Sequence, residues 1–160
     1  MSNDAPVARP TVRVLLIDAS DRVLLFKHVA ASQPERWGAP GGGIRPEESA
    51  EQAALRELWE EVGLCDAELG PCVWLRSVVY PGPNRLREMQ ERYYVCRVDE
   101  LTVDAQNQSE HERGVILDQR WWAIDEIAAS SEVFAPSALA ALLRPILAGD
   151  LPAKPIVVGV

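Results

Sequence analysis

Hydrophobic residues along this chain gather in short runs of the kind that form β-strands. The first two runs, residues 11–17 and 22–29, are rich in Val, Leu and Ile. They are separated by residues 18–21, whose short polar side chains favour a tight turn, so the pair predicts an antiparallel hairpin. Further strands are predicted at residues 73–80, 91–98 and 120–124. The polar and glycine-rich segment between the hairpin and residue 44 is expected to be a loop.

The segment at residues 50–62 instead has helical signals at both ends. Ser49 and Gln52 match a capping box, and Gly63 suits a left-handed C-terminal cap. On a helical wheel, the acidic residues share one side with Ala50 and Ala53. These small residues leave room for a ligand above the carboxylates, with alanine's role as a good helix former as the alternative. The opposite, apolar side is expected to face the core and holds Ala54, Leu55, Leu58 and Val62.

The last third of the chain combines a short helix, a longer helix and an apolar tail. The short helix is predicted at residues 126–129, directly after the strand at 120–124. A core-facing helix is predicted at residues 137–148 from four leucines at helical spacing, Leu139, Leu142, Leu143 and Leu147. The apolar run at residues 156–158 could add an edge strand or contact a partner.

Length and element order indicate one globular domain. A chain of 160 residues can bury a substantial core, and its fractions of 48% hydrophobic and 25% charged residues are ordinary for a globular protein. Strands on both sides of a central helix, followed by more helices, fit a mixed α/β sheet packed between helices. We expect a single domain over residues 1–160, with residues 1–10 and 150–160 as extended tails.

Charge and cysteine content exclude several classes of protein. The net charge of −8 argues against nonspecific binding to nucleic acid, which needs a surplus of Lys and Arg. Three cysteines without a C-x-x-C pair, and two histidines, argue against a disulfide framework or structural zinc. The first ten residues lack the apolar stretch of a secretory signal, and no run approaches the roughly 20 apolar residues of a membrane span. We therefore expect a cytoplasmic protein without a membrane partner.

Three glutamates crowd one face of the predicted central helix. Glu57, Glu60 and Glu61 stand at i, i+3 and i+4, where like charges repel by roughly 0.2–0.5 kcal/mol per pair. A bound cation removes that cost. Mg²⁺ usually takes only one or two protein carboxylates and leaves its other positions to water and substrate phosphates. The triple glycine at residues 41–43 lets the backbone approach a ligand without Cβ interference. Together these features predict a magnesium and phosphate site.

The same region resembles the signature of the Nudix hydrolases. The family pattern is Gly, five residues, Glu, seven residues, then Arg-Glu-aliphatic-X-Glu-Glu-X-Gly-aliphatic. This chain fills every position, with Gly42, Glu48, Arg56, Glu57, Leu58, Glu60, Glu61, Gly63 and Leu64. The resemblance implies the α/β/α sandwich of the Nudix fold. It also implies hydrolysis, with Mg²⁺ or with Mn²⁺ in its place, of a pyrophosphate bond in a nucleoside diphosphate linked to another moiety. Such substrates include nucleoside triphosphates, dinucleoside polyphosphates and nucleotide sugars.

The resemblance implies a set of metal ligands. Glu57, Glu60 and Glu61 would coordinate the metal together with the backbone carbonyl of Gly41. Glu48 would act through water or through a second metal ion. One departure from the family lies next to it, since many members have a glycine where this chain has Glu47.

The resemblance also implies catalytic roles. Glu57 is the expected general base, and two glutamates of a later loop, Glu110 and Glu112, are its rivals. Arg56 stands four positions before Glu60 and is expected to hold that carboxylate in its ligating rotamer through a charge-assisted hydrogen bond. An exposed ion pair that contributes almost nothing is the alternative for Arg56.

Candidate contacts to the rest of the substrate lie outside the signature. Tyr80, Trp121 and Trp122 could stack a nucleobase, with core packing of the aromatic rings as the alternative. Arg85 and Arg87 could clamp a distal phosphate, with solvated surface side chains as the alternative.

Two further functions stay open. A Nudix-like domain can bind a nucleotide as a catalytically inactive regulator, although the complete set of glutamates argues against that reading. Action on RNA 5′ ends uses the same signature, although the acidity of the chain and the lack of a basic stripe argue against it. The tail-bearing domain could also form a homodimer.

Overall fold

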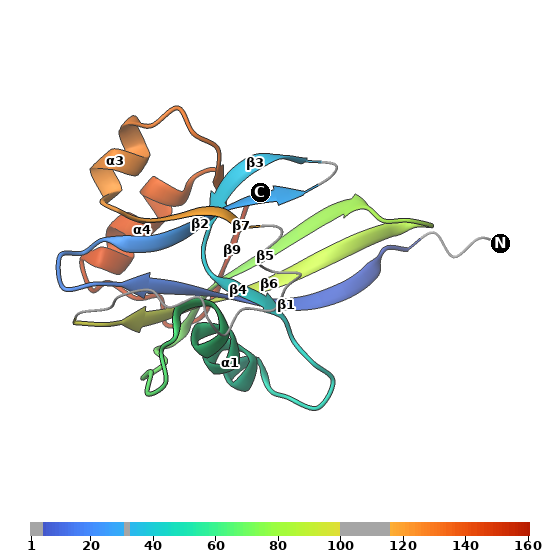
Figure 1. Ribbon diagram of the computed structural model, residues 1–160, viewed down its shortest axis with the longest axis horizontal. Helices are drawn as coiled ribbons and strands as arrows, with labels where there is room; N and C mark the ends of the chain where they lie inside the picture. Colours follow the sequence, from blue (N-terminus) through green and yellow to red (C-terminus); the bar gives the residue numbers. More distant parts are fainter. Residues whose placement is uncertain (1–4, 31–32, 100–115) are drawn as a thin grey trace.

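The computed structural model describes residues 5–30, 33–99 and 116–160, which form a curled mixed sheet with helices on both faces (Figure 1). The strands are β1 (Val7–Ile17), β2 (Val23–Ala30), β3 (Gln33–Gly38), β4 (Gly41–Gly43), β5 (Cys72–Pro81), β6 (Leu86–Arg97), β7 (Ile116–Trp122), β8 (Phe134–Ala135) and β9 (Ile156–Val158). The helices are α1 (Ala50–Val62), α3 (Ile124–Ala129) and α4 (Leu139–Leu147). The strand order is β8-β3-β2-β1-β6-β5-β9, with β4 paired to β1 and β7 to β2.

Helix α1 covers one face of the sheet, while α3 and α4 cover the other (Figure 1). Each face has its own buried apolar cluster. Val12, Val14 and Leu16 of β1 point toward α1 and pack with Leu58, whereas Leu15 and Ile17 point to the opposite face. This alternation is the period of two expected for a strand that is buried on both sides. The arrangement confirms the predicted α/β/α sandwich.

The central strand β1 is longer than predicted. It pairs in parallel with β6 along its whole length, from Val7 opposite Arg87 to Ile17 opposite Arg97. Residues 7–10 therefore belong to the sheet, and their assignment to a tail is wrong. The apolar run near the C-terminus forms β9, which pairs in parallel with β5 and confirms the edge-strand alternative, so the assignment of residues 156–158 to a tail is also wrong.

Two strands occur where the sequence predicts a loop. The polar segment of β3 pairs with β2 on one side and with β8 on the other, and Lys27 of β2 lies 3.4 Å from Glu35 of β3. The glycine strand β4 is held by antiparallel pairing with β1. Both segments have weak strand propensity, so their conformation depends on neighbours that are distant in sequence.

Helix α1 matches its prediction at both ends. The side chain of Ser49 accepts a hydrogen bond from the amide of Gln52, the capping box is complete, and Gly63 ends the helix in the left-handed region with φ of 75°. One residue of the helix differs from its prediction. Leu55 was expected on the core face, but it is 39% exposed.

Smaller shifts occur in the last third of the chain. The strand predicted at residues 120–124 runs from Ile116 to Trp122, and α3 begins at Ile124. Helix α4 spans Leu139–Leu147, one or two residues shorter at each end than predicted. Within the described ranges, no helix has the length and apolar character needed to cross a membrane.

Candidate active site

The glycine strand β4 brings backbone directly against helix α1. Gly41 pairs with Arg13 and has φ of 151°, and a Cβ added there would lie 2.0 Å from the carbonyl oxygen of Val12. A Cβ on Gly42 would lie 2.4 Å from Oε1 of Glu57. Only glycine fits either position without movement of a neighbour. The glycines thus allow a helix carboxylate and the strand backbone to meet.

Two carboxylates of α1 are buried at this junction. Glu57 is 3% exposed and Glu61 is 2% exposed. Oε2 of Glu61 accepts a hydrogen bond of 2.8 Å from the amide of Gly41. Buried carboxylates are costly unless compensated. Their position beside the glycine strand is therefore a feature that core packing alone does not explain.

Arg56 compensates the negative charges of three glutamates at once. Its guanidinium donates to Glu48 at 2.6 and 3.1 Å and to Glu57 at 2.8 Å. It also donates to Glu60 at 3.3 Å and to the carbonyl oxygen of Gly43 at 2.9 Å. The predicted contact to Glu60 is present, and it is part of a larger network rather than an isolated surface pair.

The hydrogen bonds from Arg56 also set the protonation state of Glu48, which lies in the loop before α1. They lower the pKa of Glu48 to about 2, and the amide of Arg45 adds a further hydrogen bond of 2.9 Å to the same carboxylate. The pKa of Arg56 is raised in return. Glu48 is therefore ionised at neutral pH and holds Arg56, and it connects the loop before α1 to the helix.

The donor set fits a hard divalent ion by its chemistry. Carboxylate oxygens and a backbone carbonyl are the ligands that Mg²⁺ prefers, and the absence of a Cβ at Gly42 lets the Glu57 carboxylate lie against the glycine strand. Across residues 5–30, 33–99 and 116–160, no three Asp, Glu, His or Cys side chains already stand close enough together to enclose an ion. In this arrangement Arg56 supplies positive charge at the cluster, together with Arg45, which lies 3.9 Å from Glu60.

The predicted substrate contacts lie in different places. Trp122 is 3% exposed and packs edge-on against Trp37 and Phe134, as the core-packing alternative expects. Tyr80 is half-buried on β5. The rivals for the general base, Glu110 and Glu112, lie outside the described residues.

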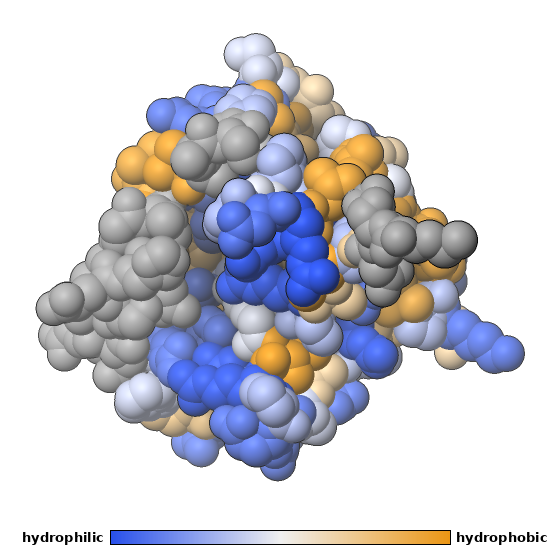
Figure 2. Space-filling model, turned by 90° about the vertical axis from the view of Figure 1, so that its right-hand side faces the viewer, coloured by the Kyte–Doolittle hydropathy of each residue, from blue (hydrophilic) through white to orange (hydrophobic). Residues whose placement is uncertain are grey.

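The two predicted phosphate-clamp arginines are exposed near the turn between β5 and β6. Arg85 and Arg87 line a cavity of about 420 Å³ together with Arg9 of β1. A Cβ on Gly43 would lie 3.8 Å from the guanidinium of Arg9, so this basic groove begins beside β4. This end of the molecule faces the viewer in Figure 2, where hydrophilic surface occupies the centre.

Sequence reasoning missed a set of charged residues inside the strands. Arg13 of β1 reaches the carbonyl oxygens of Ala39 and Gly41 at 3.4 and 3.5 Å, and it forms an ion pair of 3.0 Å with Glu91 of β6. The available signal was a charged residue within an otherwise apolar strand. In a strand that is buried on both faces, an unpaired charge loses its hydration and costs free energy, so each such residue needs a partner.

The α/β/α sandwich and the acidic helix agree with the resemblance of residues 42–64 to the Nudix signature. The family model for the NUDIX domain matches residues 7–143. The chain belongs to the Nudix family.

Curated relatives with similar sequences cover only part of the chain. The RNA pyrophosphohydrolase of Teredinibacter turnerae is 44% identical over 87 residues, which is 52% of this chain and 48% of that protein. The RNA pyrophosphohydrolase of Cellvibrio japonicus is 41% identical over 87 residues with the same coverage. The chain thus spans about half the length of the curated relatives it matches.

Solved structures share the fold over most of the chain. A NUDIX hydrolase from Nitrosomonas europaea has a TM-score of 0.62 at 21% identity and covers 92% of each chain. The NUDIX domain of Shewanella oneidensis NrtR, solved with ADP ribose, has a TM-score of 0.64 at 22% identity and covers 89% of each chain. At these identities the likeness concerns the fold alone.

Proposed function

We propose that this protein hydrolyses a pyrophosphate bond in a nucleoside diphosphate linked to another moiety, with Mg²⁺ as cofactor. The observation that carries the proposal is the junction between α1 and β4. There, two buried glutamates and Arg56 lie directly against the glycine backbone of β4, because the glycines carry no side chains. Membership of the Nudix family supports the same reaction class.

In this proposal Glu57, Glu60 and Glu61 hold the metal with the carbonyl of Gly41, and Glu48 acts through water or a second ion. When bound, the metal lowers the pKa of a water molecule and offsets the charge of the diphosphate. Glu57 accepts the proton of the attacking water.

Arg56 acts as a positioning residue in this site. Its guanidinium makes four hydrogen bonds to Glu48 and two glutamates of α1, which limits the rotamers that those carboxylates adopt. Arg56 would keep the carboxylates in place as their charge is taken up by metal and phosphate. Glu112 remains a predicted rival for the role of base.

The test is a product-resolved screen of nucleoside triphosphates, ADP-ribose, NADH and dinucleoside polyphosphates with Mg²⁺ and with EDTA. We expect turnover of at least one compound with Mg²⁺ only. Glu60→Gln is expected to lower kcat by at least about 10²-fold, on the scale of losing one electrostatic contact to the transition state. Glu47→Gln, at an exposed neighbouring glutamate, is the matched control and should keep wild-type turnover.

Two results would reject the proposal. The first is tight nucleotide binding without release of phosphate, pyrophosphate or nucleotide product, which supports the alternative of a binding module. The second is full turnover by Glu60→Gln, which places the reaction elsewhere.

A second candidate function is hydrolysis at RNA 5′ ends. The curated relatives carry that name, and the groove of Arg9, Arg85 and Arg87 offers a local basic surface on an otherwise acidic chain. Cleavage of 5′-triphosphate RNA in preference to free nucleotides, with affinity that falls steeply with salt, would favour this candidate. Arg85→Gln would then weaken RNA binding.

A cytoplasmic location and a homodimer also remain predictions. Sedimentation of the purified protein at several concentrations measures the subunit count.

A further inference from the structure

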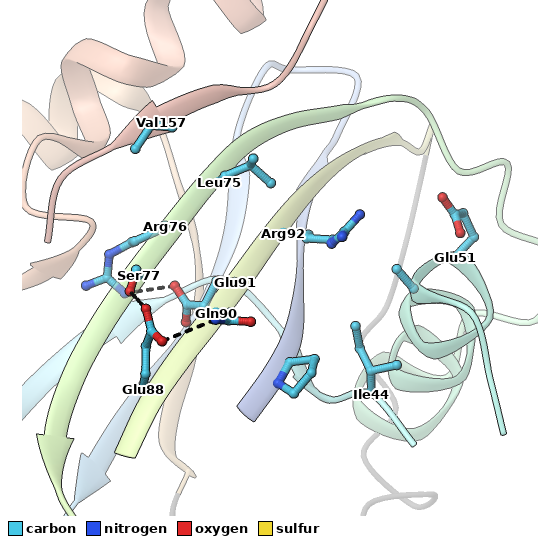
Figure 3. Close-up of a pocket in the computed structure, with 12 residues that line it drawn as sticks. Ile44, Glu51, Leu75, Arg76, Ser77, Glu88, Gln90, Glu91, Arg92 and Val157 are labelled. Atoms are coloured by element: carbon cyan, nitrogen blue, oxygen red, sulfur yellow. Dashed lines mark hydrogen bonds and ion pairs between the residues drawn. The ribbon is translucent and has the colours of Figure 1, made fainter. Parts of the chain in front are cut away.

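A second cluster of charges lies beyond Arg13, away from the glutamates of α1. At its centre Glu91 is 3% exposed and accepts hydrogen bonds from Arg13 at 3.0 Å, Arg76 at 2.8 Å and the hydroxyl of Tyr93 at 2.9 Å. Figure 3 shows the contact between Arg76 on β5 and Glu91 on β6. One carboxylate is therefore shared by two guanidinium groups.

Arg36 of β3 adds a third cation to this cluster. Its Nη1 is buried and has no hydrogen-bond partner among the described residues, and the same holds for Nε2 of His28. Burial and the charges of Arg13 and Arg76 lower the pKa of Arg36. Burial and neighbouring arginines lower the pKa of His28 to about 3, so this imidazole is neutral at physiological pH. Three arginines thus face Glu91, with Glu61 of α1 as a further negative charge that acts on Arg13.

These residues line a cavity of about 160 Å³. Sites for whole drug-sized ligands usually measure roughly 300–1,000 Å³, so this cavity has room for one small group only. It adjoins the candidate active site, because Arg13 lines the cavity and also reaches the carbonyl oxygen of Gly41 at 3.5 Å. A group bound here would belong to a molecule that extends from the active site.

We propose that this cavity binds a small anionic group of the substrate, a phosphoryl or carboxylate group, that lies outside the pyrophosphate bond to be cleaved. A neutral group such as a nucleobase would leave the excess positive charge uncompensated, whereas an anion offsets it and gives Arg36 the acceptor it lacks. The identity of the molecule as substrate rests on the proposed function, but the binding of an anion does not.

A larger hollow nearby does not offer the same charge. It measures about 600 Å³, lies over β5 and β6, and is drawn in Figure 3. Its two arginines are outnumbered by three glutamates, namely Arg76 and Arg92 against Glu51, Glu88 and Glu91. Charge therefore directs an anion to the smaller cavity.

The first test measures anion binding without metal or catalysis. Calorimetric titration of the wild-type protein in EDTA uses inorganic phosphate, acetate and guanosine as separate probes. We expect an anion to bind, at least tenfold more weakly to Arg36→Gln, with Arg36→Lys intermediate because it keeps the charge without the fork. Arg97→Gln, at an exposed ion pair with Asp21, is the matched control and should bind like wild type.

The outcomes separate the two sources of the anion and the neutral alternative. Tighter binding of phosphate identifies a phosphoryl group, and tighter binding of acetate identifies a carboxylate. Binding of guanosine alone, or of no probe, overturns the proposal. Arg36→Gln should unfold at the same temperature as wild type or higher, because it removes a half-buried cation whose Nη1 has no hydrogen-bond partner. A large drop in melting temperature would mean a structural role and would overturn the proposal.

The second test asks whether the anion belongs to the substrate. Where the first test identifies a phosphoryl group, Arg36→Gln should raise KM at least tenfold for a nucleoside triphosphate, which carries a further phosphoryl group, and leave KM for ADP-ribose unchanged. In that case, equal effects on both compounds would overturn the proposal. If no compound is hydrolysed, the proposed function fails, while the calorimetric test still decides whether the cavity binds an anion.

Discussion

Gly42→Ala separates the chemistry of the site from the stability of the fold. A Cβ at this position would lie 2.4 Å from Oε1 of Glu57, whereas ordinary contact begins at 3.4 Å. The carboxylate must therefore retreat by about 1 Å. The carboxylate would then lose the hydrogen bond of 2.8 Å that Arg56 donates, and it would move away from the edge of β4. A displacement of about 1 Å in a catalytic group costs roughly 10²-fold in rate, or about 2.7 kcal/mol in the activation barrier.

The stability of this variant should change little. The clashing atoms are the far end of a flexible side chain, and Gly42 has no positive φ that an alanine would strain. We expect a change in unfolding free energy of about 1 kcal/mol or less. Gly41→Ala should behave differently, because its φ is 151° and its Cβ would lie 2.0 Å from the backbone oxygen of Val12. That variant should lose stability as well as activity.

The assay combines steady-state kinetics on the substrate found in the nucleotide screen with a urea unfolding curve. Gly159→Ala is the matched control, since nothing lies within 4 Å of its Cβ. A Gly42→Ala protein with wild-type kcat would refute the reasoning, because Glu57 would then tolerate displacement. A Gly42→Ala protein that unfolds as readily as Gly41→Ala would also refute it.

The remaining predictions concern the buried charges. Glu91→Gln should destabilise the protein by roughly 3–5 kcal/mol in urea, because Arg13 and Arg76 lose their shared counter-charge; an unchanged midpoint would contradict this. The pKa of His28 is lowered to about 3 in the folded protein from 6.5, so between these values the unfolded chain binds more protons and stability falls as pH falls. This loss of unfolding free energy should reach at most about 1.4 kcal/mol per pH unit, and His28→Gln should reduce it. If the unfolding free energy of both proteins changes equally with pH between pH 6.5 and 4, His28 is not responsible.

The sequence predicted helix α1 to the residue because its signals are local. The capping box at Ser49, the apolar spacing and the cap at Gly63 all lie within a few residues of the helix. The grouping of Glu57, Glu60 and Arg56 followed from the same spacing, and the structure places them in one network. The strands predicted at residues 11–17 and 91–98 match parts of β1 and β6. Their full lengths could not be predicted because they depend on the pairing of these two strands with each other.

The rest depends on contacts between distant parts of the chain. Strand β4 consists of three glycines and exists because Thr11 to Arg13 pair with it. The ion pair between Arg13 and Glu91 joins residues 78 positions apart, and nothing in either local sequence specifies that partner. The cavity beside Arg36 is likewise a product of tertiary packing, so only the folded chain reveals its excess of positive charge.

The central claim is that the glutamates of α1 hold a divalent ion at the glycine strand. Titration of the protein with Mn²⁺, with the free ion measured by electron paramagnetic resonance, tests it without any assumption about substrate. We predict binding to the wild type and to Glu47→Gln, and at least tenfold weaker binding to Glu60→Gln. Absence of binding to the wild type, or equal affinity in all three proteins, would contradict the account.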